Sequence, residues 1–412
     1  MTMFDIRKRI VYLRRKNELS QHELADFLNI SRSVLAKVET GLRKLDEELI
    51  DNLSKIFRVP KDYLTQSASA KKQPLLEKIF DDFLIGNTES MFQAFSENHC
   101  VVDLEDEIAF KLLETAFHNS FGDYETADKL NKDFLELFLP TFSSFQIPDN
   151  LLKYYHIFLH EQYRRAHQFR KCQDQCRELL DIVTSNWQKG CLHLWLSIRF
   201  YESKDLGKAY LEYLKTEKYL INIANPFLIS QLLMLKSAVY SDLKLYQEAE
   251  QAQNDLLKIA TEQGLSDYIA VAYQHKGHHQ QHLGNFHAAR IQYEHAFLNV
   301  ENLTRKSELY LSLVRISIRL LDYDKGITYM HHARKEILSR HHQMILLSYE
   351  AEILLYKGEF KKQKPLLKTI LAYFRDQESN NDLKYIYTYL ANFYYDRNPL
   401  ESAYYFKLRE AL

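Results

Sequence analysis

The chain has 412 residues and carries 54 Lys and Arg against 55 Asp and Glu, a formal net charge of −1. This length exceeds one ordinary domain, and the modest charge does not suit a protein that coats nucleic acid without specificity. Only 10 Gly and 7 Pro occur, and no apolar run approaches the about 18 residues of a membrane span, so we expect helices and no transmembrane segment. The cysteines lack metal or redox spacing and the N-terminus lacks a signal-peptide core, which predicts reduced thiols and a cytoplasmic location.

Residues 20–41 predict two short helices joined by a tight turn. Ser20 and Glu23 have the spacing of a capping box, so the first helix begins at Gln21. Asn29 tolerates the positive φ of a sharp turn, Ser31 offers a second N-cap, and Gly41 ends the second helix. The side chains expected to pack between the two helices are Leu24, Ala25, Leu28, Leu35 and Val38.

The second of these helices has a polar and basic face that is typical of a DNA recognition helix. Such a helix contacts bases from its N-terminal turns, so we assign Arg32 and Ser33 to base edges and Lys37 to a base or a neighbouring phosphate. Gln21 lies at the positive end of the first helix dipole, where a phosphate is favoured. The complete set of candidate DNA-binding residues is Gln21, Ser31, Arg32, Ser33, Lys37, Arg43 and Lys44. The alternative is a helical hairpin with a basic face and no DNA function, which two caps, a turn and a terminal glycine within one short segment disfavour.

This segment resembles the helix-turn-helix family of the Cro/C1 (XRE) type. The resemblance extends from about Phe4 to Leu64. In that family an Arg at the position of Arg14 pairs with a Glu at the position of Glu39, which implies a structural ion pair here. Leu45 departs from the family, which often has Pro at this position.

Composition places a domain boundary after the helix-turn-helix segment. Residues 65–74 are small and polar and end at Pro74, which suits the start of a helix. We therefore expect a DNA-binding domain at 1–66, a linker at 67–74 and a second domain at 75–412. Residues 1–66 carry 13 Lys and Arg against 10 Asp and Glu, a modest excess that suits a regulator whose affinity depends on dimerisation.

From residue 75 onward the sequence repeats weakly but in register. A short loop is followed by an aromatic or apolar residue and then, three positions later, by a small residue, as in Phe286 and Ala289. The corresponding marker positions are Met91, Ala127, Cys172, Ala209, Ala249, Ala289, Gly326, Gln363 and Ala403. A second small residue often lies twelve positions earlier: Thr115, Ser197, Ser237, Gly277, Ala351 and Ala391.

These two small positions allow the helices of a hairpin to approach closely, as in tetratricopeptide repeats. We therefore predict an all-α protein in which the helix-turn-helix domain is followed by a right-handed superhelix of about nine repeats with a concave groove. A helical bundle without repeats is the alternative.

Helix register selects the residues of the first helices that point into the groove. The selected side chains are Arg164, Tyr201, Gln274, His278, Gln281, Arg315, Arg319, Tyr356, Asn392 and Tyr395. Amides, guanidinium groups and aromatic rings can hold the backbone, carboxylate and side chains of an extended peptide. For each single residue, a solvated polar surface position is an equally good interpretation.

Histidines cluster between residues 275 and 295, and four of them (His275, His278, His279 and His282) have the spacing of one helical face. Metal sites usually add a carboxylate or thiol and a partner for each imidazole, and neither is evident nearby, so we expect no metal and no cofactor. The pair His341 and His342 is expected at the surface. The sequence contains no phosphate-binding glycine loop, no nucleophile elbow and no H-E-x-x-H motif, so an enzyme is not expected.

A helix-turn-helix of this type followed by tetratricopeptide repeats resembles the peptide-pheromone regulators of the Rap/Rgg/NprR/PlcR/PrgX superfamily, most of all NprR. The resemblance implies a cytoplasmic homodimer or tetramer that binds a double-stranded DNA operator and a short signalling peptide in quorum sensing. It leaves two alternatives. The repeats can sequester a response-regulator protein of the sporulation phosphorelay, or the chain can be a phage-type regulator of the lysis–lysogeny decision.

Overall fold

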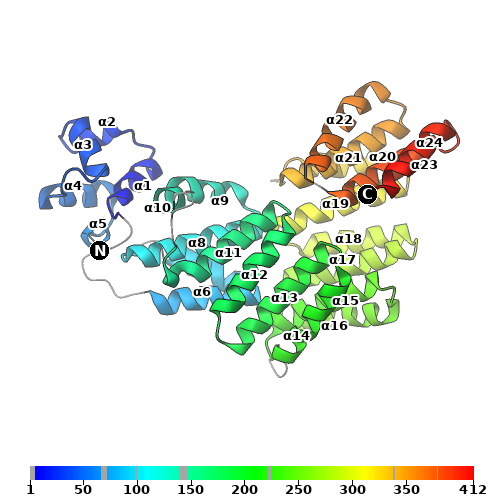
Figure 1. Cartoon of the computed structure of the whole chain (residues 1–412), viewed down its shortest axis with the longest axis horizontal. Helices are drawn as coiled ribbons and strands as arrows, with labels where there is room; N and C mark the ends of the chain where they lie inside the picture. The colour runs from blue at the N-terminus through cyan, green and yellow to red at the C-terminus, as the bar shows by residue number, and fades with distance from the viewer. Residues whose placement is uncertain are drawn as a thin grey trace. The chain divides into compact units, whose positions relative to one another are not determined.

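The computed structural model describes residues 5–65, 72–98, 101–139, 147–220, 224–336, 339–377 and 379–412. All regular secondary structure in these ranges is helical, which confirms the predicted all-α class (Figure 1). The chain forms two compact units, residues 1–228 and 229–412. The first unit contains the helix-turn-helix segment together with the first repeats, so the domain assignment at 1–66, 67–74 and 75–412 stays a prediction.

The N-terminal part of the first unit is a bundle of short helices. They are α1 (Lys8–Lys16), α2 (Gln21–Phe27), α3 (Arg32–Glu39), α4 (Glu47–Phe57) and α5 (Lys61–Thr65). We call this segment, residues 5–65, the head. Its core contains the predicted apolar set, since Leu24, Ala25, Leu28, Leu35 and Val38 are all buried.

The predicted linker ends earlier than expected, because its last two residues belong to a helix. Helix α6 begins at Gln73 with Pro74 in its first turn, because proline fixes φ at a helical value where no donor is needed. Gln73 and Pro74 are therefore helical and not linker. Residues 67–71 of the predicted linker, like Phe4 at the start of the helix-turn-helix resemblance, lie outside the described residues.

The rest of the described chain, which we call the body, consists of nine consecutive helix pairs, and this confirms the predicted repeats. The first helices of the pairs are α6 (Gln73–Ile85), α8 (Leu104–Phe121), α11 (Asp149–Arg165), α13 (Asn186–Glu202), α15 (Pro226–Asp242), α17 (Ser266–His282), α19 (Leu303–Arg319), α21 (Arg340–Tyr356) and α23 (Asn380–Tyr394). The second helices are α7 (Thr88–Glu97), α9 (Tyr124–Leu130), α12 (Phe169–Ile182), α14 (Leu206–Leu220), α16 (Tyr246–Glu262), α18 (Phe286–Asn299), α20 (Tyr323–Ala333), α22 (Phe360–Asp376) and α24 (Pro399–Glu410). In the second pair, α9 continues through a π-helical turn, η1 (Asn131–Leu135), into α10 (Glu136–Phe138).

Small side chains at the repeat positions let the paired helices touch. A Cβ at Gly277 would lie 2.6 Å from the Tyr293 ring, so only glycine fits between α17 and α18. Ser197 donates its hydroxyl to the backbone oxygen of Ala209, which links α13 to α14. The marker residues from Met91 to Gln363 are buried, as the repeat pattern requires.

The last marker is displaced by one residue. Ala403 is exposed, whereas Ser402 is buried and donates its hydroxyl to the backbone oxygen of Ala391 at 2.9 Å. The reason is that α24 is capped by Asn398 and starts at Pro399, one residue earlier than the repeat spacing implies. Ser402 therefore occupies the position that we had assigned to Ala403.

Candidate nucleic-acid interface and ligand groove

The predicted caps and turn of the helix-turn-helix are present. Ser20 N donates to Glu23 Oε2 at 2.7 Å and Glu23 N donates to Ser20 Oγ at 3.2 Å, which completes the capping box. Asn29 has φ 53° between the helices, and Gly41 has φ 81° after α3. Val34 N donates to Ser31 Oγ at 3.3 Å, so Ser31 caps α3.

Six of the seven predicted DNA-contacting side chains are exposed, and the seventh, Gln21, is partly exposed. Ser31, Arg32, Ser33, Lys37, Arg43 and Lys44 are all exposed, while Leu35 and Val38 on the opposite face of α3 are fully buried. Arg43 has only a long exposed pair with Asp46, 3.9 Å between Nη2 and Oδ2. An exposed pair of this kind is weak, so the guanidinium can exchange Asp46 for a phosphate.

Gln21 has a structural partner in addition to any contact with DNA. The structure contains the ion pair that the family resemblance implies, with Arg14 Nε 2.7 Å from Glu39 Oε1. Gln21 Nε2 donates to the other carboxylate oxygen of Glu39 at 2.8 Å, and Arg32 Nε donates to Gln21 Oε1 at 3.5 Å. Buried Glu39 thus orients Gln21, and Gln21 in turn restrains Arg32 at the start of α3.

The sequence interpretation missed the contact that joins the head to the body. Arg9 is completely buried, and its Nε donates to Glu107 Oε2 of α8 at 2.6 Å. Tyr63 donates its hydroxyl to the other oxygen of Glu107 at 2.5 Å, and its ring lies 4.1 Å from the Arg9 guanidinium. Arg9 also donates to the backbone oxygens of Tyr63, Val101 and Val102. We call Arg9, Tyr63 and Glu107 the junction.

Burial makes the junction sensitive to the loss of either charge. Burial raises the pKa of Glu107, and the Arg9 charge opposes that shift. Tyr12 of α1 packs edge-on against Phe134 of η1 at 4.9 Å between ring centroids, and Lys8 Nζ donates to the backbone oxygen of Leu137. The head therefore shares buried polar and aromatic contacts with α8 to α10. Arg9 cannot contribute to DNA binding, although it counts toward the positive charge of residues 1–66.

In the first unit, the predicted groove residues Arg164 and Tyr201 are partly buried. Arg164 Nε donates to Glu161 Oε2 at 2.6 Å, and Arg164 Nη2 donates to the backbone oxygen of Asn119. Burial alone would raise the pKa of Glu161, but Arg164 and His160 outweigh burial and hold it at about 2. Tyr201 has Lys204 above its ring at 5.1 Å. Arg164 is thus anchored by its own neighbours and has only part of its donor capacity free for a ligand.

In the second unit, His278 and Gln281 of α17 converge on one tyrosine of α18. Tyr293 donates its hydroxyl to Gln281 Oε1 at 3.2 Å, and the His278 ring lies edge-on to Tyr293 at 5.5 Å. His278 is exposed, whereas Gln281 and Gln274 are partly buried. His278, Gln281 and Tyr293 therefore form a small polar cluster between α17 and α18.

Arg315 and Tyr356 lie beside a buried acid that the sequence interpretation missed. Glu352 is buried on α21 and accepts a hydrogen bond from the Tyr385 hydroxyl of α23. Burial raises the pKa of Glu352, while Arg319 and Arg315 act in the opposite direction. The Arg315 guanidinium lies 5.9 Å from the Tyr385 ring, and Tyr356 stacks on Tyr323 at 6.3 Å. Glu352 directly follows the small residue Ala351. Arg315 lies at the corresponding position of its own repeat, so the repeat pattern could have identified Glu352 as well.

Arg319, Asn392 and Tyr395 are exposed. Asn392 precedes Phe393, whose ring packs edge-on against Tyr356 at 5.5 Å. The second unit therefore brings Arg315, Arg319 and Tyr356 close to one aromatic cluster. Asn392 is exposed on α23, and Tyr395 directly follows this helix. That these residues contact a peptide remains a prediction.

The four histidines lie on one helix, α17, and the rings of His275 and His278 stack at 6.4 Å, but the four side chains differ in burial and in their partners. The buried side chain of His279 packs against Tyr246, and His275 Nδ1 is hydrogen-bonded to Ser237, whereas His278 and His282 are exposed. Among the described residues, no group of three or more His, Cys, Asp or Glu side chains has a geometry that could hold a metal ion. His342 is also buried and not a surface residue, because its position on α21 faces the core. No helix in the described ranges has the length and apolar character needed to cross a membrane.

Comparison with known proteins assigns the head. Residues 10–64 match the family model described as helix-turn-helix. No curated protein sequence matches the chain.

Solved structures match the body in fold. A Rap protein crystallised with competence and sporulation factor is 15% identical, with a TM-score of 0.66, and the match covers 82% of this chain and 96% of that one. The apo form of the quorum sensor NprR from B. thuringiensis is 13% identical with a TM-score of 0.53, covering 82% and 97%. The Rap conjugation gene regulator of plasmid pLS20, in complex with the Phr* peptide, is 12% identical with a TM-score of 0.54, covering 81% and 92%. The resemblance predicted from the sequence is confirmed: the head matches a helix-turn-helix family, and the body has the fold of Rap and NprR.

Proposed function

We propose that this chain is a DNA-binding transcriptional regulator whose repeats bind a short signalling peptide, and that it acts in the cytoplasm as a homodimer or tetramer. The observation that carries the proposal is the exposed face of α3, where Arg32, Ser33 and Lys37 project from a helix-turn-helix whose opposite face is fully buried. No other part of the described chain combines a sequence-matched module with an unobstructed basic face.

On DNA, α3 enters the major groove with its N-terminal turns toward the bases. Arg32 and Ser33 contact base edges, and Lys37 contacts a base or an adjacent phosphate. Gln21, held by Glu39, meets a phosphate at the N-terminus of α2, and Arg43 and Lys44 bind the same strand. Because Gln21 also restrains Arg32, less conformational freedom is lost when the guanidinium contacts a base.

The repeats supply the ligand site. The Rap structure with competence and sporulation factor and the plasmid regulator with the Phr* peptide share this fold, which supports a peptide as the ligand class. In our proposal the peptide lies along the first helices of the repeats. In the second unit its carboxylate and backbone are bound by Gln274, His278, Gln281, Arg315, Arg319 and Asn392, and its side chains lie against Tyr356 and Tyr395. Arg164 and Tyr201 are the candidate peptide contacts within the first unit.

Coupling between the two sites passes through the junction. Because Arg9 and Tyr63 bond to Glu107 of α8, the orientation of each recognition helix is fixed relative to the first repeats. Two heads in a dimer contact half-sites about 34 Å apart, or a multiple of that distance. A peptide that binds one quaternary state more tightly than the other favours that state. The resulting change in DNA affinity is set by the difference between the peptide's binding free energies for the two states.

Calorimetric titration tests the ligand class directly. Synthetic peptides encoded immediately downstream of this gene are titrated into the full chain, into Arg315→Ala and Asn392→Ala, and into the control Lys362→Ala, an exposed residue of α22. We expect one peptide to bind with submicromolar affinity, with at least a tenfold loss in the first two variants and none in the control. If no peptide binds the wild-type chain, the body does not serve as a peptide receptor.

A second candidate function is a scaffold that sequesters a response-regulator protein. The observation that favours it is the match to the Rap structure, which covers 82% of this chain and 96% of that chain. The double variant Arg32→Ala/Lys37→Ala removes the proposed DNA contacts and leaves the junction residues unchanged. A scaffold would keep its cellular phenotype in this variant, and a transcription factor would lose it.

A further inference from the structure

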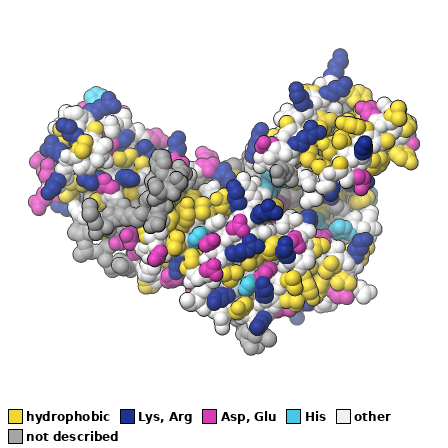
Figure 2. Space-filling view, in the orientation of Figure 1, with side chains coloured by type: hydrophobic (Ala, Val, Ile, Leu, Met, Phe, Trp, Pro, Cys, Tyr) yellow, Lys and Arg dark blue, Asp and Glu magenta, His cyan; other side chains and the backbone are white. Residues whose placement is uncertain are grey.

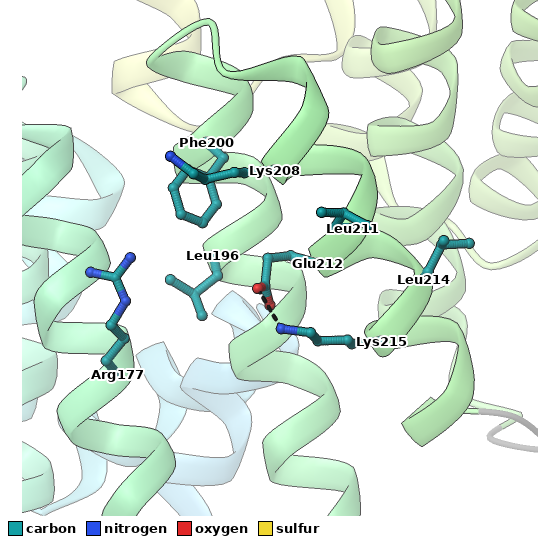
Figure 3. A pocket seen from close by; sticks show the side chains of 8 residues that line it. All are labelled: Arg177, Leu196, Phe200, Lys208, Leu211, Glu212, Leu214 and Lys215. Carbon is teal, nitrogen blue, oxygen red and sulfur yellow. Dashed lines mark hydrogen bonds and ion pairs between the residues drawn. The ribbon is translucent and has the colours of Figure 1, made fainter.

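Two exposed sets of cations in the first unit differ in how closely acids neutralise them. The groove between α12 and α14, with a volume of about 410 Å³, is lined in part by Arg177, Lys208 and Lys215 (Figure 3). Each of these side chains pairs with an acid three residues away, at 2.7 or 2.8 Å, so the three cations are neutralised in place. The loop after α3 is different, because the ion pair of Arg43 with Asp46 there is 3.9 Å long.

Net charge alone does not mark the part of the head that binds DNA. Figure 2 shows Lys and Arg side chains spread over the visible face of the head among Asp and Glu side chains. The position of each cation therefore depends on the backbone that carries it. For Arg43 and Lys44 this backbone is the loop between α3 and α4, residues 40–46, which we call the α3–α4 loop.

Arg7, a residue outside the α3–α4 loop, holds the loop near its start. Arg7 is the N-cap residue of α1, and its Nη1 donates to the backbone oxygen of Gly41 at 3.0 Å. A Cβ at Gly41 would lie 2.7 Å from Arg7 Cζ, so the guanidinium packs directly on this glycine. The contact links the start of the head to the end of the recognition helix.

The Arg7 guanidinium is itself held in one orientation. Asp5 Oδ1 accepts from Arg7 Nε at 2.7 Å and from the Arg7 backbone N at 3.0 Å. Because the N–H groups of a guanidinium point in fixed directions, the bond to Asp5 aims the remaining donors at Gly41. The Arg7 side chain is 33% exposed, so its ion pair with Asp5 contributes little to the stability of the fold.

The next two residues fix the start of α1 on the body. Lys8 Nζ donates to the backbone oxygen of Leu137, and Arg9 forms the buried ion pair with Glu107. Arg7 therefore projects from a backbone that is anchored directly beside it. A side chain held in this way can restrain the α3–α4 loop instead of moving with it.

We propose that Arg7 is a positioning residue of the DNA interface. The inference rests on the proposed function, in which Arg43 and Lys44 bind phosphates. Arg7 fixes Gly41, and Arg43 and Lys44 follow it after two and three residues, so less conformational freedom is lost when they bind DNA. Arg7 acts through the α3–α4 loop and not by a contact of its own with DNA.

Hydrogen exchange and DNA titration of the full-length chain test the proposal together. In the free protein, Arg7→Ala should speed up amide exchange in residues 40–46, because the loop loses a restraint. On a labelled DNA duplex of mixed sequence, Arg7→Ala should weaken binding about tenfold and lower the slope of log affinity against log salt by about 1–2, since two phosphate contacts are loosened. The matched control is Arg15→Ala, which removes an exposed Arg of α1 and should leave loop exchange unchanged.

A triple variant separates positioning from direct contact. In the background Arg43→Ala/Lys44→Ala, a further Arg7→Ala should cost no more affinity, because the loop has no cation left to place. A second loss of the same size there would show that Arg7 binds a phosphate itself and would overturn the proposal. Unchanged loop exchange in Arg7→Ala would overturn it as well. If the wild-type chain binds no duplex even at low salt, the proposed function itself is wrong, and the role of Arg7 falls with it.

Discussion

The exposed face of α3 and the predicted groove of the body differ in how their charged side chains are used. On α3 the polar residues Arg32, Ser33 and Lys37 are exposed, and their opposite face provides the core. In the body, Arg164 is held by Glu161, and Glu352 is buried and accepts a hydrogen bond from Tyr385. A motif therefore predicts an exposed polar face on the head, whereas in the body the polar residues predicted for the groove are partly held by neighbouring side chains. Four predictions can break or sharpen this contrast.

The largest effect is expected at the junction, where Arg9 of the head forms a buried ion pair with Glu107 of α8. Arg9→Met leaves the buried carboxylate of Glu107 without its cation, which should lower the free energy of unfolding by about 3–5 kcal/mol. Chemical denaturation measures the change. The double variant Arg9→Met/Glu107→Leu removes the orphaned charge and should recover most of the loss. If the double variant is less stable than Arg9→Met alone, the junction does not act as a buried ion pair.

Acid should destabilise the body through His275. Burial lowers the pKa of His275 to about 4, with the Arg305 charge acting in the same direction. Below the ordinary pKa near 6.5 the unfolded state binds a proton that the folded state does not, so stability falls as the pH drops from about 6.5 to about 4, by up to about 3 kcal/mol.

Denaturation curves of the wild type and His275→Gln across this pH window measure the contribution of this side chain. The variant should show a shallower loss of stability, while His278→Gln, a change at an exposed neighbour on the same helix, should not. Equal pH slopes for the wild type and His275→Gln would refute the assignment.

The close approach of paired helices in the body predicts a cost for a single added methyl group. Gly277→Ala places a Cβ 2.6 Å from the Tyr293 ring, and overpacking of this kind costs about 1–3 kcal/mol. Gly207→Ala is the control, because a Cβ there meets only a side-chain atom of Asp205 at 3.9 Å. Thermal unfolding compares the two. If both variants match the wild type, helix contact at Gly277 is not tight.

The smallest expected effects separate two roles on the exposed face of α3. Arg32→Ala should relax base preference by about 1–3 kcal/mol, measured by competition between operator and mutated operator. Lys37→Ala should weaken binding to all sequences and reduce the slope of log affinity against log salt by about 1. Unchanged operator preference in Arg32→Ala would show that Arg32 does not contact a base.

The parts of this structure that the sequence predicted depend on local signals. The capping box at Ser20 and Glu23, the positive φ of Asn29 and the φ of Gly41 each involve residues within one or two helical turns. The repeat markers succeed for the same reason, since a small residue such as Ala289 has to contact the preceding helix of its own hairpin. Ala403 failed because one proline shifted the start of α24.

The parts that the sequence did not predict depend on partners far apart in the chain. Arg9 resembles any other basic residue of the head until Glu107, 98 residues later, is placed against it. The histidines at 275 and 279 have helical spacing with 278 and 282, but His275 is hydrogen-bonded to Ser237 and the buried His279 packs against Tyr246, both residues of another hairpin. Pattern alone assigns a residue to a helix face, and only packing decides whether that face meets solvent, a ligand or a neighbouring repeat.

Selection of double-stranded DNA from a random library by the full-length chain tests the central claim most directly. We predict an enriched operator with two half-sites whose centres lie about 34 Å apart or a multiple of it, because two heads bind through paired α3 helices. The matched selection with Arg32→Ala/Lys37→Ala should lose this sequence. Failure of the wild type to enrich any sequence, or equal enrichment by the double variant, would contradict the assignment of α3 as a DNA-reading helix.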